Sequence, residues 1–455
     1  MSEQTTGGRF DSLRSLDDRR VLTPPVAPRG SASDRDETGF PSRTDARFDS
    51  LRSLNDRGVP LDDRGVLLKA RIADRLADVD AELVTLSDEL HADPEVGWQE
   101  VRSSARVAAV LERHGFAVER PYLGLETAFR AVHGSGDGFT VGFLAEYDAL
   151  PGLGHACGHN LISAMSVGGA IALAEIADDL GITVEVIGTP AEEGYGGKIE
   201  LLERGAFTEL DFALMAHPAP VDVAEAEPFA VAHWHIRYDG KAAHAAAYPE
   251  RGVNANDAFL IAQTAIALLR QQLPPGVRVH GVQTRGGEAP NAIPERTEGR
   301  WYVRAESTEK LLELEQRVLK CFEAGALATG AVLTVTPEGG RYSEMRTDEQ
   351  ALDLYRANAI SLGRDFDVDP VAATMNRAST DMGNVSQVVD AIHPYIGVGG
   401  DASNHQPEFA QACVGATAER ALRDGALALA WTALDVACSR AASSAPIATL
   451  EGERV

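Results

Sequence analysis

The chain has 455 residues, of which 44% are hydrophobic, and a formal net charge of -26 at pH 7. This length favours two or three domains, and the acidic balance argues against nucleic acid and anionic membranes as partners. No apolar run reaches the roughly 18 residues that span a bilayer, and the polar N-terminus does not resemble a signal peptide. The cysteines are too widely spread for a disulfide framework. We therefore expect a cytoplasmic protein.

Residues 1–62 are rich in Pro, Gly, Ser, Arg and Asp and have little apolar surface to bury. The segment Phe10–Leu16 recurs at Phe48–Leu54, although two copies are too few for a repeat protein. We predict a disordered tail with a duplicated segment, and a short docking motif is the alternative. The last residues, 446–455, are expected to be flexible.

After the tail, apolar residues recur at helical spacing from Val66 to about His91, and a second amphipathic helix is expected from about Gln99 to His114. Apolar strands and helical patterns then alternate: strands at 127–132, 139–145, 182–188 and 212–216, and helices at 160–180 and 197–205. This alternation indicates an α/β fold with a mostly parallel sheet, covered by helices on both faces. In such sheets functional residues gather at the carboxyl ends of the strands.

The pattern changes near Glu227. The next hundred residues or so predict strands at 229–238, 277–284, 297–305 and 331–337, and helices at 254–273 and 308–327. Two helices on one antiparallel sheet would form a compact, ferredoxin-like α+β domain. Helix and strand resume after about Tyr342 and end in an Ala-rich helix at 416–437. We therefore expect a discontinuous larger domain, 63–227 and 341–445, with a smaller domain, 228–340, inserted into it.

The stretch 145–160 follows an apolar strand and holds carboxylates, histidines and a cysteine. Cys157 and His159 stand two apart across a glycine, so one bend could direct both side chains at the same point. Thiolate, imidazole and carboxylate groups are ligands that zinc or manganese accepts. The alternative is a strand-to-helix turn that happens to contain two histidines.

Three further polar segments follow apolar strands. Glu192 and Glu193 are adjacent, and adjacent side chains in an extended segment point to opposite sides. One carboxylate could bind metal while the other takes a proton from a metal-activated water and returns it to a leaving amine; the alternative is a solvated acidic turn. His217 follows the strand at 212–216, where a structural histidine is the alternative. His405 lies in a glycine-rich loop, which would otherwise be a flexible surface loop.

These signals are weak separately but share one position in the predicted fold. Together they would supply enough ligands for two ions that share a bridging group: Cys157, His159, Glu193, His217 and His405. A pair of close ions activates water and polarises a carbonyl, so the residues predict metal-assisted hydrolysis. Spacing alone leaves open whether an amide or an ester is cleaved.

The chain contains the motifs AEYDALPGLGHACGHN, TPAEEGYGGK, GKAAHAA, APNAIPE and GGDASNHQPEF. With them it resembles the two-metal aminoacylase, carboxypeptidase and dipeptidase superfamily, in particular the branch of auxin-conjugate amidohydrolases and p-aminobenzoyl-glutamate hydrolase subunits. The resemblance runs from about Leu67 to Cys438. It implies that the five residues above bind the metals, that Glu192 is the general base, and that Asp148 is a carboxylate behind the ligands that positions the site.

By the same resemblance, residues 228–340 form a lid and dimerisation domain. His244 is similar to a histidine that enters the active site of the partner subunit and stabilises the oxyanion, which implies a homodimer. Asn291 is similar to a substrate-binding amide. Arg304 is a candidate for binding a substrate carboxylate, with a solvated strand residue as the alternative, and Gly400 would let a substrate approach the backbone closely.

The chain also departs from the family pattern. Glu146 stands where more distant members carry a metal-binding histidine, and Cys157 where they carry a bridging aspartate. Asn160 replaces the aspartate that is usual in the auxin-conjugate enzymes. This last difference favours a small dipeptide or acyl-amino acid as the substrate.

We therefore expect a dimeric amidohydrolase or dipeptidase with two divalent ions, zinc or manganese, or else cobalt. It would cleave the amide bond of a small dipeptide, an N-acyl amino acid or an aminobenzoyl-glutamate-like substrate, with Glu192 as the base. One alternative is a non-catalytic, metal-binding regulatory or partner subunit of a related hydrolase. The other is a cysteine hydrolase that uses Cys157, which is disfavoured because metal binding would compete for the thiolate.

Overall fold

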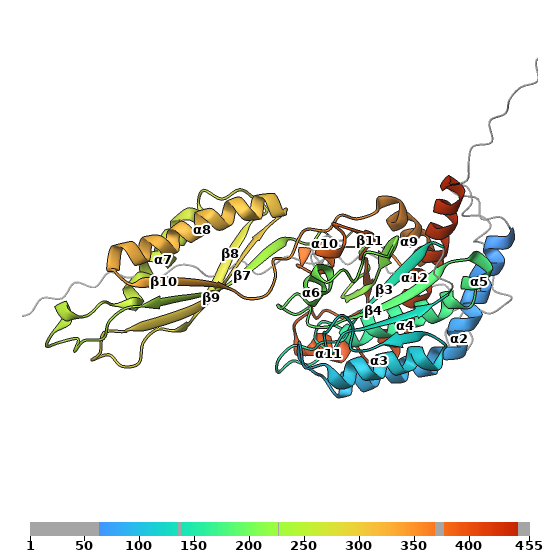
Figure 1. Cartoon of the computed structure of the whole chain (residues 1–455), viewed down its shortest axis with the longest axis horizontal. Coiled ribbons are helices and arrows are strands. Elements are labelled where there is room, and N and C mark those ends of the chain that lie inside the picture. Colours follow the sequence, from blue (N-terminus) through green and yellow to red (C-terminus); the bar gives the residue numbers. More distant parts are fainter. Residues whose placement is uncertain (1–62, 135–137, 226, 369–376, 445–455) are drawn as a thin grey trace, which may run out of the picture.

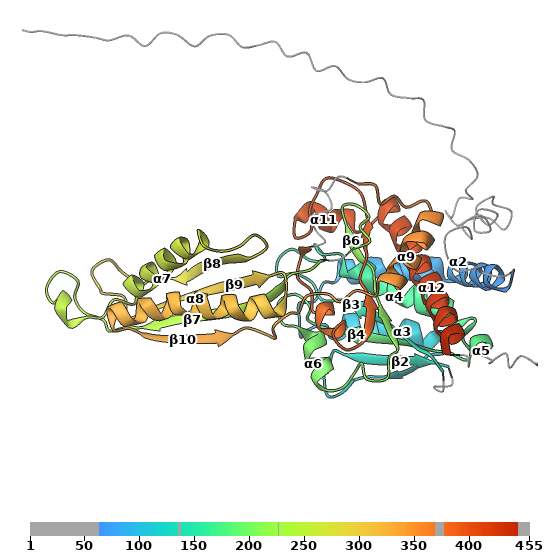
Figure 2. The ribbon, with the colours of Figure 1, turned by 90° about the horizontal axis from the view of Figure 1, so that it is seen from above.

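The structure is a computed structural model that describes residues 63–134, 138–225, 227–368 and 377–444. The predicted N-terminal tail and flexible C-terminus lie outside these ranges. Figures 1 and 2 show two bodies, a larger one that contains both ends of the described chain and a smaller one that extends away from it. None of the helices in the described ranges is long and apolar enough to cross a bilayer.

The larger body is built on a six-stranded sheet with the strand order β1-β2-β4-β3-β5-β11. The last four strands in this order are parallel to one another, and the edge formed by β1 and β2 pairs in antiparallel fashion. The strands are β1 (Ala117–Glu119), β2 (Phe129–His133), β3 (Thr140–Glu146), β4 (Thr183–Thr189), β5 (Phe212–Leu214) and β11 (Asp390–Ile392). Every residue of β3 and β4 is buried, as expected for parallel strands that are covered on both faces.

Helices cover both faces of this sheet, as the alternating pattern predicts. Helix α4 (His159–Ala174) is almost entirely buried between the sheet and two long helices, α2 (Asp63–Ala92) and α12 (Ala416–Ser444). Helices α3 (Val101–Arg113) and α9 (Glu349–Ser361) belong to the same core. On the other face, α6 (Gly197–Glu203) and α10 (Met382–Val385) contribute to a second core. Two short helices, α5 (Ala177–Leu180) and α11 (Pro407–Ala412), complete this body.

The smaller body is a four-stranded antiparallel sheet with the order β10-β7-β9-β8. Its strands are β7 (Ala230–Asp239), β8 (Arg278–Arg285), β9 (Arg296–Ala305) and β10 (Val332–Pro337), and a short 3-10 helix spans Pro249–Arg251. Helices α7 (Ala255–Arg270) and α8 (Thr308–Thr329) pack side by side on one face (Figure 2). They bury a core of their own around Phe259, Trp301 and Phe322. The expected insertion of two helices on an antiparallel sheet is therefore present.

The structure contains an edge strand, β1, that the sequence pattern does not predict, and it differs from the predicted elements at α4 and after β5. The helix expected at 160–180 is divided into α4 and α5, because Ile176 is fully buried and its N–H turns back to the carbonyl of Leu173. The chain after β5 also breaks and forms a separate strand, β6 (His217–Ala219), which pairs in parallel with β12 (Tyr395–Gly397). Three-residue strands of this kind are too short for a periodic sequence signal.

Candidate metal centre and active site

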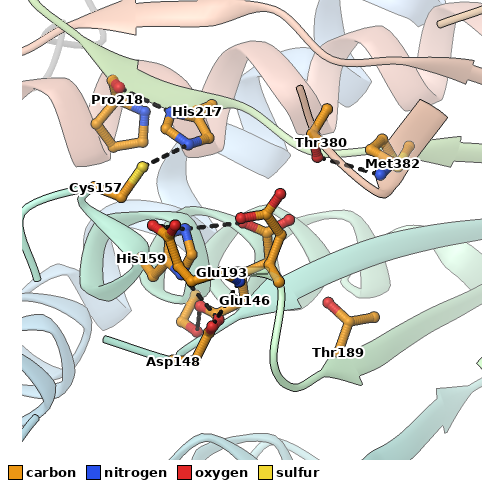
Figure 3. A network of polar contacts seen from close by, with 12 residues as sticks. Glu146, Asp148, Cys157, His159, Thr189, Glu193, His217, Pro218, Thr380 and Met382 are labelled. Carbon is orange, nitrogen blue, oxygen red and sulfur yellow. Dashed lines mark hydrogen bonds and ion pairs between the residues drawn. The ribbon is translucent and has the colours of Figure 1, made fainter. Parts of the chain in front are cut away.

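Most of the predicted metal ligands, together with Asp148, lie at or just beyond the carboxyl ends of neighbouring strands. Asp148 lies just beyond β3, Glu193 follows β4, and His217 begins β6 directly after β5. The loop after β3 carries Cys157 and leads into α4, whose first residue is His159. Since β3, β4 and β5 are parallel, their carboxyl ends meet at one edge of the sheet. Figure 3 shows these side chains around a common space.

The five expected ligands fall into two groups that share the cysteine. The ligand atoms of Cys157, His159 and His217 lie within 4.8 Å of one another, and so do those of Cys157, Glu193 and His405. The sulfur of Cys157 is 3.5 Å from Nε2 of His217, and Nε2 of His405 is 3.4 Å from Oε1 of Glu193. A thiolate that belongs to both groups can bridge two cations.

The surroundings of these side chains fit bound cations. Nε2 of His159 and Oε1 of Glu193 are buried and have no hydrogen-bond partner among the described residues, which is costly unless something else satisfies them. Nδ1 of His159 is 3.0 Å from a carboxylate oxygen of Asp148, and Nδ1 of His217 is 2.8 Å from the carbonyl oxygen of Pro218. Both bonds leave the Nε2 lone pair free to bind a metal.

The charges in the site favour deprotonation of the cysteine. Burial alone would raise the pKa of the Cys157 thiol, but the neighbouring histidines, His217 foremost, hold this pKa well below its ordinary value. This shift favours the thiolate, which is the form that binds metals. Burial, followed by the charges of Glu146 and Glu193, raises the pKa of Glu192 well above its ordinary value. Glu192 is thus a carboxyl group with high proton affinity beside the ligand groups.

Sequence reasoning missed a buried lysine behind this site. Lys198 is fully buried, and its ammonium group donates to Glu146 and to Asp381, at 2.6 Å each. The second oxygen of Glu146 lies 3.4 Å from Nε2 of His159, and Glu146, His159 and Glu192 form a third group of close ligand atoms. The lysine stands in the motif TPAEEGYGGK, but the sequence does not show that Asp381 meets it.

A cavity of about 480 Å³ opens onto the ligand groups and is lined by both bodies. Of the predicted substrate-binding residues, Arg304 lies in its wall, where Nη1 donates to the hydroxyl of Ser379 at 2.7 Å. The wall also includes Tyr302 and Tyr342. Gly400 is exposed and is not among the residues that line the cavity.

His244 and Asn291 lie away from this cavity within one chain. Both are exposed, and they are close together because the N–H of Ala245 donates to the carbonyl of Asn291 at 2.9 Å. His244 follows β7 and Asn291 precedes β9, at the end of the small sheet where Asp239 pairs with Arg296, which is opposite the end that carries Arg304. Their predicted contacts with substrate therefore require a second copy of the chain.

Comparison with known proteins agrees with this arrangement. Residues 228–329 match the peptidase dimerisation domain of the M20 family. The chain is 41% identical to Xaa-Arg dipeptidase of Mus musculus, over 81% of this chain and 89% of that protein. It is 32% identical to one of the subunits of p-aminobenzoyl-glutamate hydrolase from Escherichia coli, over 57% and 58% of the two chains.

The fold also matches solved structures. An aminobenzoyl-glutamate utilization protein from Klebsiella pneumoniae aligns with a TM-score of 0.61 at 21% identity, over 79% of this chain and 98% of that one. A dinuclear metal-binding peptidase of the M20 family from Bacillus subtilis aligns with a TM-score of 0.57 at 21% identity, over 77% and 98%. The identity to Xaa-Arg dipeptidase along most of both chains, together with the dimerisation domain, shows that this chain belongs to the M20 family of peptidases and amidohydrolases, which hydrolyse amide bonds.

Proposed function

We propose that the chain is a two-metal dipeptidase or amidohydrolase that releases an amino acid from a small aminoacyl or acyl group. The observation that carries this proposal is the convergence of two ligand groups on one thiolate, beside Glu192, in the wall of the cavity. The names of the relatives, an Xaa-Arg dipeptidase and a subunit of a p-aminobenzoyl-glutamate hydrolase, support the same bond type.

The five side chains would hold two divalent ions, with Cys157 as the bridge. His159 and His217 would bind one ion, and Glu193 and His405 the other. Zinc, manganese and cobalt all accept this set of sulfur, nitrogen and oxygen ligands. When bound, such ions polarise the scissile carbonyl group and make the attacking water more acidic. Asp148 would orient His159 and the backbone of Glu193.

Glu192 would move the proton during the reaction. Its carboxylate would accept a proton from the attacking water and later donate it to the nitrogen of the departing amine, which restores the base. The carbonyl oxygen of Glu192 accepts a hydrogen bond from the hydroxyl group of Tyr342, so the backbone of the base is fixed. His244 of a second copy would donate to the oxyanion that develops on the carbonyl oxygen.

The cavity suggests a substrate with a free carboxylate. Among the described residues no carboxylate forms an ion pair with Arg304, so its guanidinium group can bind the carboxylate of an amino acid. The cavity volume lies in the usual range for small-molecule sites. The inserted domain would act as a lid and as the dimer interface, with Asn291 of the second copy as a further substrate contact.

The test is an activity screen of the purified chain after reconstitution with zinc, manganese or cobalt. The substrates are dipeptides with different C-terminal residues, N-acyl amino acids and p-aminobenzoyl-glutamate, and the matched control is Glu192→Gln with its metal content measured. We expect turnover that requires metal and is lost in the variant while the metal is retained. Full turnover by Glu192→Gln, or turnover that survives complete metal removal, would contradict the proposal.

A further inference from the structure

The turn between β4 and Glu192 contains an uncommon backbone conformation. Ala191 has a φ angle of 57°, in the left-handed region that residues other than glycine rarely adopt. Ala191 is fully buried and directly precedes the proposed base. Such conformations persist only where the surrounding structure holds them, and they cluster at functional sites. The contacts of this residue therefore matter for the direction of the Glu192 side chain.

A buried carboxyl group from another part of the chain bonds to the backbone of this turn. The N–H of Ala191 donates to Oε1 of Glu100 at 2.8 Å, and the carbonyl of Ala191 accepts from the N–H of Gly197 at 3.2 Å. Among the described residues, Glu100 is the side chain that bonds the Ala191 peptide group. Its contact reaches across 91 positions of the sequence, so it fixes the turn relative to a separate part of the chain.

The burial of the Glu100 carboxyl group costs free energy. It is fully buried, and its second oxygen, Oε2, has no hydrogen-bond partner among the described residues. Burial, and after it the charge of Asp148, raises the pKa of Glu100 to about 7. An apolar residue of the same size would avoid this cost. A stabilising role alone therefore does not explain the carboxyl group, whereas its bond to Ala191 does.

The segment before Glu100 touches both catalytic loops. Val96 forms a β-bridge with Ala149, next to Asp148. A Cβ atom on Gly97 would lie 3.2 Å from Cα of Ala191, which shows that this segment packs directly on the turn. A change at Glu100 would therefore act on the turn that carries the base.

We propose that Glu100 is a positioning residue that keeps the Ala191 turn left-handed, so that Glu192 faces the reacting atoms while Glu193 faces the metal ligands. This inference rests on the proposed role of Glu192 as the base. If Ala191 relaxed to a negative φ, the carboxyl group of Glu192 would turn away from this direction, whereas Glu193 would stay bonded to Asp148 through its N–H. Small displacements of a catalytic group of this kind have large effects on rate.

The test compares two substitutions of similar size in the metal-reconstituted full chain. Glu100→Gln keeps an oxygen acceptor for the Ala191 N–H, and Glu100→Met removes it. We expect Glu100→Gln to keep kcat within about threefold, and Glu100→Met to lower kcat by about 30- to 100-fold. The KM and the bound metal, measured by elemental analysis, should stay within about twofold of wild type in both variants, because neither substitution touches the ligands or the cavity wall.

A second substitution tests the turn directly. Glycine adopts positive φ without strain, so Ala191→Gly in the Glu100→Met background should recover about fivefold or more of the lost kcat. If Glu100→Met does not fold, as judged by circular dichroism, Glu100→Asp replaces it, since its shorter side chain draws the acceptor away from Ala191.

The outcomes separate the inference from the proposed function. A wild-type kcat in Glu100→Met would overturn the positioning role. Equal losses of kcat in Glu100→Gln and Glu100→Met, accompanied by loss of metal or of folded protein, would overturn it as well. If Glu192→Gln is inactive in the same assay, the proposed function survives that result. If Glu192→Gln is fully active, both ideas are wrong.

Discussion

Replacement of Lys198 by methionine should destabilise the chain more than any exposed lysine substitution. The Lys198 ammonium group is fully buried and pairs with Glu146 and Asp381 at 2.6 Å each. Methionine fills a similar volume but leaves two buried carboxyl groups without their cation. Removing one partner of a buried ion pair costs about 3–5 kcal/mol. At roughly 2–3 °C per kcal/mol, we expect Tm to fall by about 6–15 °C.

The loss of stability caused by Lys198→Met should also depend on pH. The folded-state pKa of Asp381 is about 6, above its ordinary value, because burial outweighs the attraction of Lys198. The folded chain therefore holds this proton where the unfolded chain has lost it, and the free energy of unfolding falls as the pH rises toward 6. Without Lys198 the pKa of Asp381 rises further, so the free energy of unfolding of the variant continues to fall at higher pH. We therefore expect a larger difference in stability between the variant and the wild type at pH 8 than at pH 5.

The assay is thermal unfolding of the metal-free chain at both pH values, followed by circular dichroism. Lys310→Met is the matched control, because Lys310 pairs with Glu306 at the exposed surface, where such pairs contribute less than about 1 kcal/mol. A Tm for Lys198→Met within about 2 °C of the control at pH 8, which corresponds to no more than about 1 kcal/mol, would refute the reasoning.

Three further results are expected. Glu192→Gln should lower kcat by about 100-fold or more with its metal retained, because it cannot accept the proton; normal kcat would exclude it as the base. Arg304→Met should raise KM by at least about tenfold for substrates with a free carboxylate but not for their C-terminal amides, and equal effects on both would show that it does not bind the carboxylate. His244→Ala and Glu192→Gln, inactive alone, should regain about a quarter of wild-type activity when refolded together, because mixed dimers hold one complete site; no recovery would argue against sharing of sites between subunits.

Much of the fold follows from local patterns in the sequence. Strands β3 and β4 are continuous apolar runs, helices α2 and α8 repeat apolar residues at helical spacing, and α12 is rich in alanine. The order of these elements predicts both the parallel strands of the sheet and the insertion. The antiparallel edge strand β1 and the strand pair β6 and β12 were not predicted. Each has three residues, and its pairing depends on tertiary contacts rather than on propensity.

The candidate site also contains residues that the sequence predicts and residues that it does not. Cys157, Glu193 and His217 follow predicted strands, so topology alone places them near one another, and the structure brings them together. Their assigned roles stay predictions. Lys198 and Glu100 could not be found from the sequence, because each is defined by a partner far along the chain. Asp381 is 183 positions from Lys198, and Ala191 is 91 positions from Glu100.

The sulfur shared by the two ligand groups has a consequence for metal uptake. Cys157 belongs to both groups, so whichever ion binds first would fix the loop that carries this sulfur for the other. The two positions would therefore fill cooperatively, and a calorimetric titration should show one merged step rather than two. Alkylation of this single atom would therefore empty both positions together and abolish the proposed metal-dependent activity.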